Sequence, residues 1–594
     1  MSEYNAPLED MRFVINHLAG LGEINQLPDY EGAAQDIVDP VMEEAAKLAG
    51  EILAPLNAIG DAFGARVEGE AVVTHEGFKQ AYQQFVEGGW PALSGSPEYD
   101  GMGLPALVSI PVSEMWQSAN TAFSLCPMLS NGAAHAIKMH ASDVLKQIYL
   151  PKMVSGEWTG TMNLTEPQAG SDLAAVKVRA VPEGDHYRIT GTKIFITWGD
   201  NSFTENIIHL VLARLPDAPE GSRGISLFLV PKYLVNADGS LGERNDVFPV
   251  SVEHKMGIHA SPTCVMSFGE DKGAIGYLVG LENEGLARMF TMMNEARMAV
   301  GMQGVAISER ALQQAVAFAK ERVQGGVAGQ KGSVAIINHP DVRRMLMLMK
   351  SMTEAMRAVG YCTAAAMDIA QASQDEDAKR RASRRVDLMI PIVKGWLTEN
   401  SQEITSLNVQ VHGGMGYIEE TGAAQHMRDA RILPIYEGTT GIQGMDLVGR
   451  KIMRDNGLAL MDLIADMKAT EAEFTGAGED LNRIRQGLAE GISLLEQTAG
   501  WLLENLQTNG NVMGSVAVNV MMLAGVVSGA WQMARAALIS QHQLGANKGN
   551  QSFYQAKIVT AKFYMDHILP RAAAYLKVIT AGSDTVMALS QDQF

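Results

Sequence analysis

The spacing of apolar residues changes twice along this chain, and these changes limit the folds that it can adopt. Up to about residue 155, apolar residues recur at intervals of three and four, as in VMEEAAKLAGEILAPLNAIG, which indicates amphipathic helices. From about 157 to 280, short segments alternate with a period of two between Gly and Pro residues. Beyond about 283 the helical spacing returns. This order predicts an α+β fold with helices and strands in separate stretches.

The central stretch predicts a small, barrel-like antiparallel sheet. VKVRAV and HYRITG lie on either side of the turn residues 182–185 and form a predicted hairpin. KIFITW, NIIHLVLARL, GISLFLV and TCVMSF are further short strands, rich in β-branched and aromatic residues. Their separations are too short for intervening helices, so we expect antiparallel pairing. No GxGxxG motif follows an early strand, and a Rossmann fold therefore has no support.

Long helices are predicted over residues 285–320, 340–372 and 385–411. The stretch DEDAKRRASRR has acids followed by bases, which favours a solvated connection between helices over a binding patch. Past Arg454 a weakly periodic region is typical of an appended bundle. We predict four domains: an N-terminal α-helical domain (1–155), a middle β domain (156–282), a helical bundle (283–455) and an appended C-terminal helical domain (456–594).

The charge balance and the cysteines exclude several classes of partner. Lys and Arg number 47 against 67 Asp and Glu, and the net charge of −20 argues against nucleic acid or an anionic membrane surface. The three cysteines have no CxxC spacing, so neither a disulfide framework nor a metal site is expected. No signal peptide is visible. We expect a cytoplasmic protein without a bound metal.

A run of 30 residues between Glu504 and Arg535 carries no formal charge. It is long enough to span a membrane. However, Asn, Gln and Gly residues interrupt it, and no basic cluster flanks either side. The run therefore predicts a helix buried inside a bundle, with small residues permitting close approach. Peripheral membrane contact stays open as an alternative.

Two polar segments of the central stretch are candidates for ligand binding. In LTEPQAGSDL, residues 164–173, hydroxyls and backbone N–H groups suit a phosphate or the edge of a heteroaromatic ring. A plain polar turn is the alternative. In KIFITWGD, Phe195 and Thr197 share one face of a strand and can flank a flat cofactor. Ordinary sheet packing is the alternative there.

Two segments of the later helical stretch are further candidates. Pro434 breaks the chain, and Thr439 or Thr440 can cap the helix that follows. Glu437 lies between Tyr436 and Gly438, where partial desolvation raises the pKa of a carboxylate toward that of a general base. An exposed loop glutamate is the alternative. In NVQVHGGMGY, two adjacent glycines allow close approach to the backbone, or simply form a turn.

These four segments, in this order and at these separations, resemble the flavin-dependent acyl-CoA dehydrogenase family. LTEPQAGSD is similar to the first signature of the family, and QVHGGMGYIEETGAAQHMRDARILPIYEGTTGIQ to its C-terminal signature. KMGIHASPTCVMSF and MMNEARMAVG match family positions between them. The likeness covers roughly residues 40–455. The extended N-terminus and the appended bundle resemble the large subgroup, and within it the dehydrogenases that act on 3-(methylthio)propanoyl-CoA.

The resemblance implies a mechanism. Glu437 is expected to remove the pro-R α-proton of an acyl-CoA, and its backbone N–H, with a flavin ribityl hydroxyl, to hold the thioester carbonyl. The N5 atom of FAD then accepts the β-hydride, and trans-2-enoyl-CoA forms. Some members carry the base immediately before the arginine of MNEARMAV; that position is Ala296 here, and Glu295 points about 100° away on a helix. Glu437 is therefore the family-consistent base.

The resemblance also implies binding residues, two of which depart from the family pattern. Phe195 stands where Trp is commoner, and His259 stands where many members have Arg. Four flavin contacts are expected to come from an adjoining subunit: Arg322, Gln410, Gly413 and Gly414. The expected flavin contacts within the subunit are Met162, Leu164, Thr165, Gly170, Ser171, Phe195, Thr197 and Thr439, and the expected substrate contacts are Ser171, Arg297 and Gly438.

The implied partners are an acyl-CoA substrate, electron-transfer flavoprotein as electron acceptor, and further copies of the chain in a homodimer or homotetramer. An acyl-CoA oxidase, which passes electrons to oxygen, is the nearest alternative. A non-catalytic, membrane-associated helical protein built around residues 505–534 is the alternative of another class.

Overall fold

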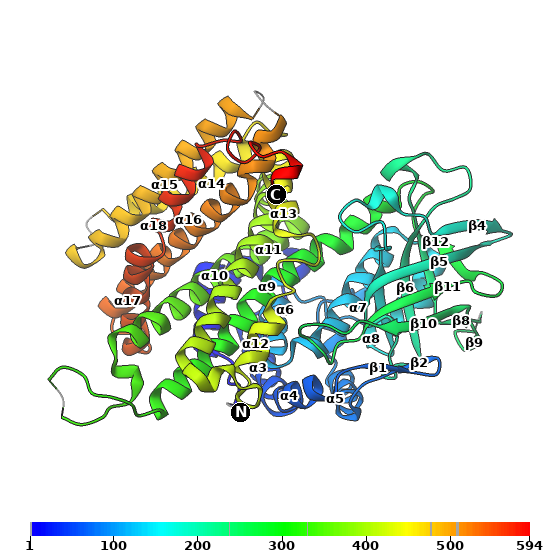
Figure 1. The fold of residues 1–594 in the computed structure, drawn as a ribbon, viewed down its shortest axis with the longest axis horizontal. Coiled ribbons are helices and arrows are strands. Elements are labelled where there is room, and N and C mark those ends of the chain that lie inside the picture. The colour runs from blue at the N-terminus through cyan, green and yellow to red at the C-terminus, as the bar shows by residue number, and fades with distance from the viewer. Residues whose placement is uncertain (1–2, 237, 330, 476–477, 507–509) are drawn as a thin grey trace. The chain divides into compact units, whose positions relative to one another are not determined.

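The computed structural model describes residues 3–594 apart from 237, 330, 476–477 and 507–509. The chain divides into two units, which are described separately (Figure 1). The helical unit comprises Met1–Glu43, Pro105–Glu114 and Val300–Phe594, and the sheet unit comprises Glu44–Leu104 and Met115–Ala299. Residues of both units occur in α3 (Gln35–Lys47), α6 (Ala106–Ala119) and α9 (Gly285–Glu321).

The described residues of the sheet unit form one eight-stranded sheet, in the order β10-β11-β5-β12-β7-β6-β3 with β4 paired to β5. The pairs are antiparallel except β3 with β6, so the expectation of a purely antiparallel sheet is wrong for that pair. A parallel pair needs a long crossover, and the segment containing β4 and β5 supplies it. The strands are β3 (Trp158–Asn163), β4 (Arg179–Glu183), β5 (His186–Thr197), β6 (Asn206–Ala213), β7 (Ser226–Pro231), β10 (Val247–Val252), β11 (Thr263–Phe268) and β12 (Ala274–Leu278).

The predicted hairpin is confirmed, because β4 pairs with β5 from Glu183 and His186 onward. HYRITG and KIFITW are not two strands, however, but one continuous strand, β5. The structure adds a small β8 (Tyr233–Val235) and β9 (Leu241–Arg244) pair. It also adds a hairpin of β1 (Arg66–Glu68) and β2 (Ala71–Val73) within the stretch predicted as helical.

The side chains of β6 are all buried and alternate between two core clusters, so this strand lies between two cores. Ile208, Leu210 and Leu212 belong to a cluster with residues of α7 (Thr121–His140) and α8 (Asp143–Ser155). Val211 and Ala213 belong to a second cluster with Phe228 and residues of β11. Both faces of β6 are therefore covered, which explains its nearly uninterrupted apolar sequence. The sheet unit also contains α4 (Ala54–Phe63) and α5 (Glu76–Glu87).

The helical unit contains the long helices that the sequence predicts. Helix α9 ends one residue past the predicted 285–320, and α10 (Pro340–Ala372) has the predicted bounds. Within this unit α14, α16 and α17 pack against α10 or α11, and α15 and α18 pack against α16 (Figure 1). Its other helices are α1 (Leu8–Phe13), α2 (Leu21–Ile24), α11 (Glu376–His412), α12 (Ala423–Ala430), α13 (Thr440–Met445), α14 (Leu458–Glu473), α15 (Glu479–Asn505), α16 (Gly510–Gly545), α17 (Gln551–His567) and α18 (Pro570–Ile579).

DEDAKRRASRR is not a connection between helices but contains the start of α11. The Asp375 side chain caps the helix by accepting hydrogen bonds from the backbone N–H groups of residues 377 and 378. The basic residues that follow pair with α14: Arg384 contacts Asp462 at 2.8 Å and Arg385 contacts Asp466 at 2.7 Å. The charge pattern thus starts a helix and joins it to the appended domain.

Residues 510–534 of the charge-free run belong to α16, Asn505 ends α15, and residues 507–509 lie outside the described residues. By length and composition α16 qualifies as a candidate membrane span, but 67% of its most apolar stretch is buried within the protein. It packs against α10, α11, α13, α15, α17 and α18. A Cβ atom at Gly525 would lie 2.2 Å from the Trp396 ring, so the missing side chain allows this packing. The prediction of a buried bundle helix is confirmed.

A buried ion cluster joins the first and last parts of the chain. Arg357 of α10 is 1% exposed and donates to Asp10 at 2.6 Å, and to Glu114 and Glu309 at 2.7 Å each. Lys557 of α17 also donates to Asp10. The cluster therefore unites α1, α6, α9, α10 and α17 through charges that water does not screen.

Candidate functional site

The first candidate segment is a tight loop at the end of β3. Glu166 and Ala169 exchange backbone hydrogen bonds of 3.0 and 2.9 Å, which closes the turn. Gly170 and Ser171 follow and are exposed. A Cβ atom at Gly170 would meet nothing within 4 Å, so the backbone there is open to a ligand. Leu164 is buried, and Thr165 is half-buried.

A buried ion pair holds this loop against β5. The Lys193 ammonium is fully buried and donates to Glu166 at 2.8 Å and to the Leu164 carbonyl at 2.9 Å. Burial lowers the pKa of Lys193 to about 8. Burial alone would raise the pKa of Glu166, but the charge and hydrogen bond of Lys193 lower it. The sequence analysis did not identify this pair, because partners 27 residues apart have no local pattern.

Phe195 and Thr197 lie at the end of β5, next to that loop. The Ile194 N–H donates to the Thr165 carbonyl at 3.0 Å, which ties the strand to the loop. Phe195 has a left-handed φ of 59°, and the register with β11 shifts at this point. Its ring is 58% exposed, while Ile196 is buried and Thr197 is half-buried. An exposed aromatic ring on a strained backbone is a feature that packing alone does not require.

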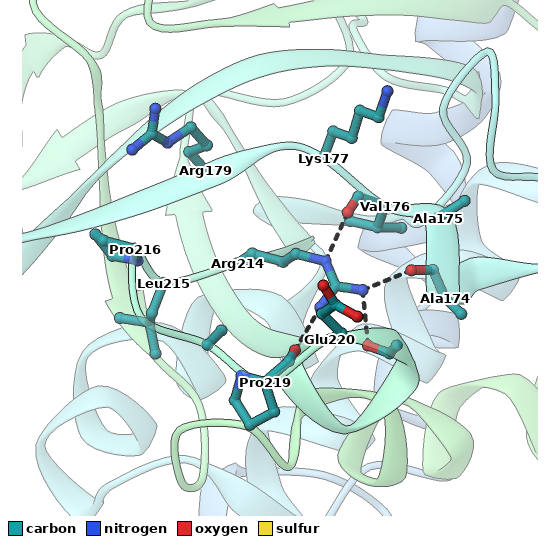
Figure 2. Close-up of a pocket in the computed structure, with 12 residues that line it drawn as sticks. Ala174, Ala175, Val176, Lys177, Arg179, Arg214, Leu215, Pro216, Pro219 and Glu220 are labelled. Atoms are coloured by element: carbon teal, nitrogen blue, oxygen red, sulfur yellow. Dashed lines mark hydrogen bonds between the residues drawn. The ribbon is translucent and has the colours of Figure 1, made fainter.

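A pocket of about 550 Å³ in the sheet unit is lined by residues 174–177, 179, 214–216 and 218–221 (Figure 2). Among the described residues, none of the predicted site residues lines it. The Arg214 guanidinium is engaged by the carbonyls of residues 174, 176, 219 and 221, at 2.7 to 3.1 Å. Figure 2 shows the charged ends of Lys177 and Arg179 pointing away from Arg214. Arg214 thus holds two loops together through hydrogen bonds.

The helical unit carries Glu437 in a short loop between α12 and α13. Glu437 is half-buried and has a left-handed φ of 56°. Such a conformation costs a residue with a side chain roughly 1–2 kcal/mol. Thr439 caps α13 by accepting a hydrogen bond from the Ile442 N–H, as predicted. The loop therefore holds a carboxylate in a strained position, as functional sites often do.

Side chains from three helices hold the Glu437 loop. Gln443 of α13 donates to the carbonyls of Glu437 and Gly438 at 3.1 and 3.2 Å. Lys394 of α11 donates to the Gly438 carbonyl at 2.6 Å. The Tyr436 hydroxyl donates to Gln303 of α9. Burial, followed by the nearby charge of Glu437, raises the pKa of Tyr436.

The positions around Arg297 lie on the sheet-unit part of α9. Arg297 and Ala296 are both buried. Glu295 forms an ion pair with His135 of α7. Burial lowers the pKa of His135, but the contact with Glu295 outweighs this and raises it. Glu295 is thus engaged with α7. His259 contacts Asp61 at 3.0 Å and the Lys255 carbonyl at 2.9 Å.

The remaining predicted contacts lie on the surface of the helical unit. Arg322 follows the end of α9, and Gln410 lies in the last turn of α11; both are exposed. A Cβ atom at Gly413 or Gly414 would meet nothing within 4 Å. The neighbouring Tyr417 is 84% exposed. These residues are therefore accessible in the single chain, as contacts to an adjoining subunit require.

Family models match almost the whole chain. "Acyl-CoA dehydrogenase, N-terminal domain" matches residues 61–157, and "Acyl-CoA dehydrogenase, middle domain" matches 161–270. "Acyl-CoA dehydrogenase, C-terminal domain" matches 283–453. "Acetyl-CoA dehydrogenase C-terminal like" matches 463–590. The last match covers most of the appended helices.

Curated relatives match over their full lengths. 3-Methylmercaptopropionyl-CoA dehydrogenase of Ruegeria pomeroyi is 46% identical over 590 residues, which cover 99% of this chain and 100% of the relative. The broad-specificity linear acyl-CoA dehydrogenase FadE5 of Mycobacterium tuberculosis is 33% identical, with 100% of each chain covered.

Solved structures share the fold. ACDH-11 of Caenorhabditis elegans in complex with C11-CoA has a TM-score of 0.76 at 20% identity, over 96% of this chain and 93% of that one. The acyl-CoA dehydrogenase of Bacillus anthracis complexed with FAD has a TM-score of 0.71 at 20% identity, over 96% and 92%. The electron transferring flavoprotein of Acidaminococcus fermentans has a TM-score of 0.56 at 26% identity, over 71% and 98%.

Proposed function

Because this chain belongs to the acyl-CoA dehydrogenase family, we propose that it acts on 3-methylmercaptopropionyl-CoA with Glu437 as the catalytic base. The chain is an FAD-dependent oxidoreductase that dehydrogenates an acyl-CoA thioester. A non-catalytic helical protein, the alternative of another class, is therefore wrong. The identity of 46% over the full length of a dehydrogenase named for this thioester carries the substrate proposal.

The residues of the sheet unit fit a flavin. Phe195 presents an exposed ring beside the half-buried Thr197. The loop bearing Thr165, Gly170 and Ser171 is hydrogen-bonded to the same strand and has an open backbone at Gly170. An aromatic face beside hydroxyl and N–H groups suits a flat ring with polar edges. We assign the isoalloxazine to this surface, with Met162 and Leu164 beside it, and the far end of FAD to Arg322, Gln410, Gly413 and Gly414 of an adjoining subunit and to Thr439.

When bound, FAD supplies the two-electron acceptor for the β-hydrogen of the thioester. The Glu437 carboxylate takes the α-proton, and its backbone N–H donates a hydrogen bond to the thioester carbonyl. That bond stabilises the negative charge that develops on the carbonyl oxygen as the proton leaves. Ser171, Arg297 and Gly438 contact the substrate. The bonds from Gln443 fix the loop carbonyls, so Glu437 keeps its strained backbone before substrate arrives.

The electron acceptor, the assembly and the location are part of the same proposal. We propose electron-transfer flavoprotein as the acceptor, a homodimer or homotetramer as the assembly and the cytoplasm as the location. The likeness to the flavoprotein of Acidaminococcus fermentans supports a shared flavin-binding fold. The open backbone at Gly413 and Gly414 supports contact with a second copy.

The decisive experiment follows the visible spectrum of the purified protein under anaerobic conditions while saturated acyl-CoAs are added. Flavin absorbance that bleaches fastest with 3-methylmercaptopropionyl-CoA supports the proposal. Faster bleaching with butyryl-CoA or a longer thioester rejects the substrate but keeps the reaction. Stoichiometric peroxide formation under air identifies an oxidase instead. The Glu437→Gln variant is the matched control: it is expected to keep its flavin and to lose the bleaching.

A further inference from the structure

Lys394 is a buried cation at the Glu437 loop that the sequence analysis did not single out. It lies in α11, its side chain is 0% exposed, and its Nζ donates to the Gly438 carbonyl at 2.6 Å. Gly438 follows the proposed base directly. A neutral donor can make the same hydrogen bond, as Gln443 does to the same oxygen. The hydrogen bond alone therefore does not explain why the donor carries a charge.

An ammonium group is costly to bury unless a negative charge lies close to it. Two carboxylates of the helical unit interact with residues of this segment. Glu399 of α11 accepts a hydrogen bond from Thr440. The negative charge of Asp429 in α12 contributes to the raised pKa of Tyr436. Both carboxylates disfavour a further negative charge on Glu437, whereas Lys394 favours it.

We propose that Lys394 is a positioning residue for the base: it fixes the loop through the Gly438 carbonyl and keeps the Glu437 carboxylate ionised. Its two effects are separable. Gln443 shares the first of them, since it donates to the same carbonyl. Of these two donors, Lys394 alone has the second effect, which is to favour the ionised Glu437, because its charge is opposite to those of Glu399 and Asp429. The base can then accept a proton at a pH at which an uncompensated carboxyl group in this loop would remain protonated.

The first test is the pH dependence of anaerobic flavin bleaching by the best acyl-CoA. In Lys394→Met the acid limb of the profile is expected to move up by about one pH unit, with a loss of about tenfold in rate on that limb. Lys394→Arg, which keeps the charge, is expected to hold the limb within a few tenths of a unit. A Lys394→Met profile that coincides with that of the wild type overturns the proposal.

The matched control is Lys557→Met. Lys557 is 4% exposed in the same unit and belongs to the Asp10 and Glu354 cluster, away from the loop in sequence and in bonding. This variant also loses a buried ammonium and is expected to melt at a lower temperature. Its acid limb is expected to stay in place. An equal shift in both variants means that the effect is a general loss of stability, and it overturns the proposal.

The second test does not depend on turnover. The melting temperatures of Lys394→Met, Glu437→Gln and the double variant are compared with that of the wild type. If the two charges compensate each other, the double variant loses less than the sum of the single losses. Additive losses overturn the proposal. If Lys394→Met does not fold, a double variant that folds supports the proposal. A double variant that also fails to fold contradicts the proposal.

This inference rests on the proposed role of Glu437, but the two can fail separately. A wild-type protein that no acyl-CoA bleaches rejects the proposed function, while the melting cycle still reports the coupling of the two residues. A wild type that bleaches, combined with an unchanged Lys394→Met profile, rejects only the role of Lys394.

Discussion

Lys193 and Glu166 form an ion pair with 2.8 Å between Nζ and Oε1, and water reaches neither charge to a significant extent. Neither residue is a predicted flavin contact. The pair nevertheless joins the loop that carries Thr165 to the strand that carries Phe195. Its geometry determines how two parts of the proposed flavin surface face each other.

Lys193→Met is expected to weaken FAD binding at least tenfold and to lower stability by about 3–5 kcal/mol, because Glu166 is left as an unpaired buried charge. Fluorescence titration of the apoprotein with FAD and thermal melting measure the two effects. Lys193→Met with Glu166→Gln is the control and is expected to recover much of the stability. An unchanged FAD dissociation constant in Lys193→Met means that the pair does not shape the flavin surface.

Glu437→Gln is expected to lower the rate of bleaching by about 10²-fold or more, since that is the usual cost of losing a general base. The flavin spectrum and the melting temperature show whether cofactor and fold are kept. Stopped-flow absorbance measures the rate. Activity within about tenfold of the wild type would mean that another group removes the proton.

Asp368 predicts a pH-dependent stability. It lies in α10, caps α6 by accepting from the N–H groups of residues 106 and 107 at 2.7 and 2.9 Å, and burial raises its pKa from 3.8 to about 7. The folded state therefore binds the proton more tightly than the unfolded state. The stability from this proton is complete below about pH 4 and is lost as the pH rises through 7.

Asp368→Asn has no such proton and is the matched variant. The melting temperature of the wild type relative to Asp368→Asn is expected to fall between pH 5 and pH 8. At about 1.4 kcal/mol per pH unit, the interval from 3.8 to 7 corresponds to at most roughly 4 kcal/mol. A constant difference across that range would show that Asp368 does not titrate there.

Arg357→Met is expected to lower stability by 3 kcal/mol or more, because Asp10, Glu114 and Glu309 then keep buried charges without their common partner. Arg357→Lys keeps the positive charge but lacks the planar guanidinium that binds several carboxylates at once. It is expected to recover part of the lost stability. Thermal melting with limited proteolysis of the N-terminal segment measures the effect. A loss below about 1 kcal/mol would place the cluster with ordinary surface ion pairs.

Two glycines of α16 make a matched pair. Gly525→Ala is expected to destabilise the protein by about 1–3 kcal/mol, because its Cβ would lie 2.2 Å from the Trp396 ring. Gly514→Ala has open space and is expected to be stabilising by about 0.5–1 kcal/mol. Melting temperatures of the two variants should move in opposite directions. Equal shifts would mean that α16 does not pack closely at Gly525.

The order and type of the elements were predictable because long helices and short strands leave strong periodic signals. Helix α10 has the predicted bounds, and α9 differs by one residue. Pairing was less predictable, because the alternation of a strand does not record its partner. The sequence gives β3 and β6 no feature that distinguishes a parallel from an antiparallel neighbour. The interpretation of DEDAKRRASRR as a connection between helices was wrong for a similar reason. The partners of its arginines on α14 lie more than 70 residues away.

The residues of the candidate site also differ in how far the sequence predicts them. A proline, a glycine and a cap made Glu437 and Thr439 candidates from local sequence, and the resemblance to the family then favoured Glu437 as base over an exposed loop glutamate. Lys394 and Gln303 were not, since each is one polar residue on an otherwise regular helix and only the folded chain brings it to the loop. The proposed site residues thus have local patterns, whereas the residues that hold their loop depend on tertiary contacts.

The contact between Asp10 and Lys557 joins residues 547 positions apart. During synthesis, Asp10 leaves the ribosome long before Lys557 has been made. The ion pair between Asp10 and Lys557 therefore forms only after α17 has been synthesised, although Arg357 of α10 can bind Asp10 earlier. A polypeptide that ends before residue 557 lacks this ion pair and keeps only the contact of Asp10 with Arg357.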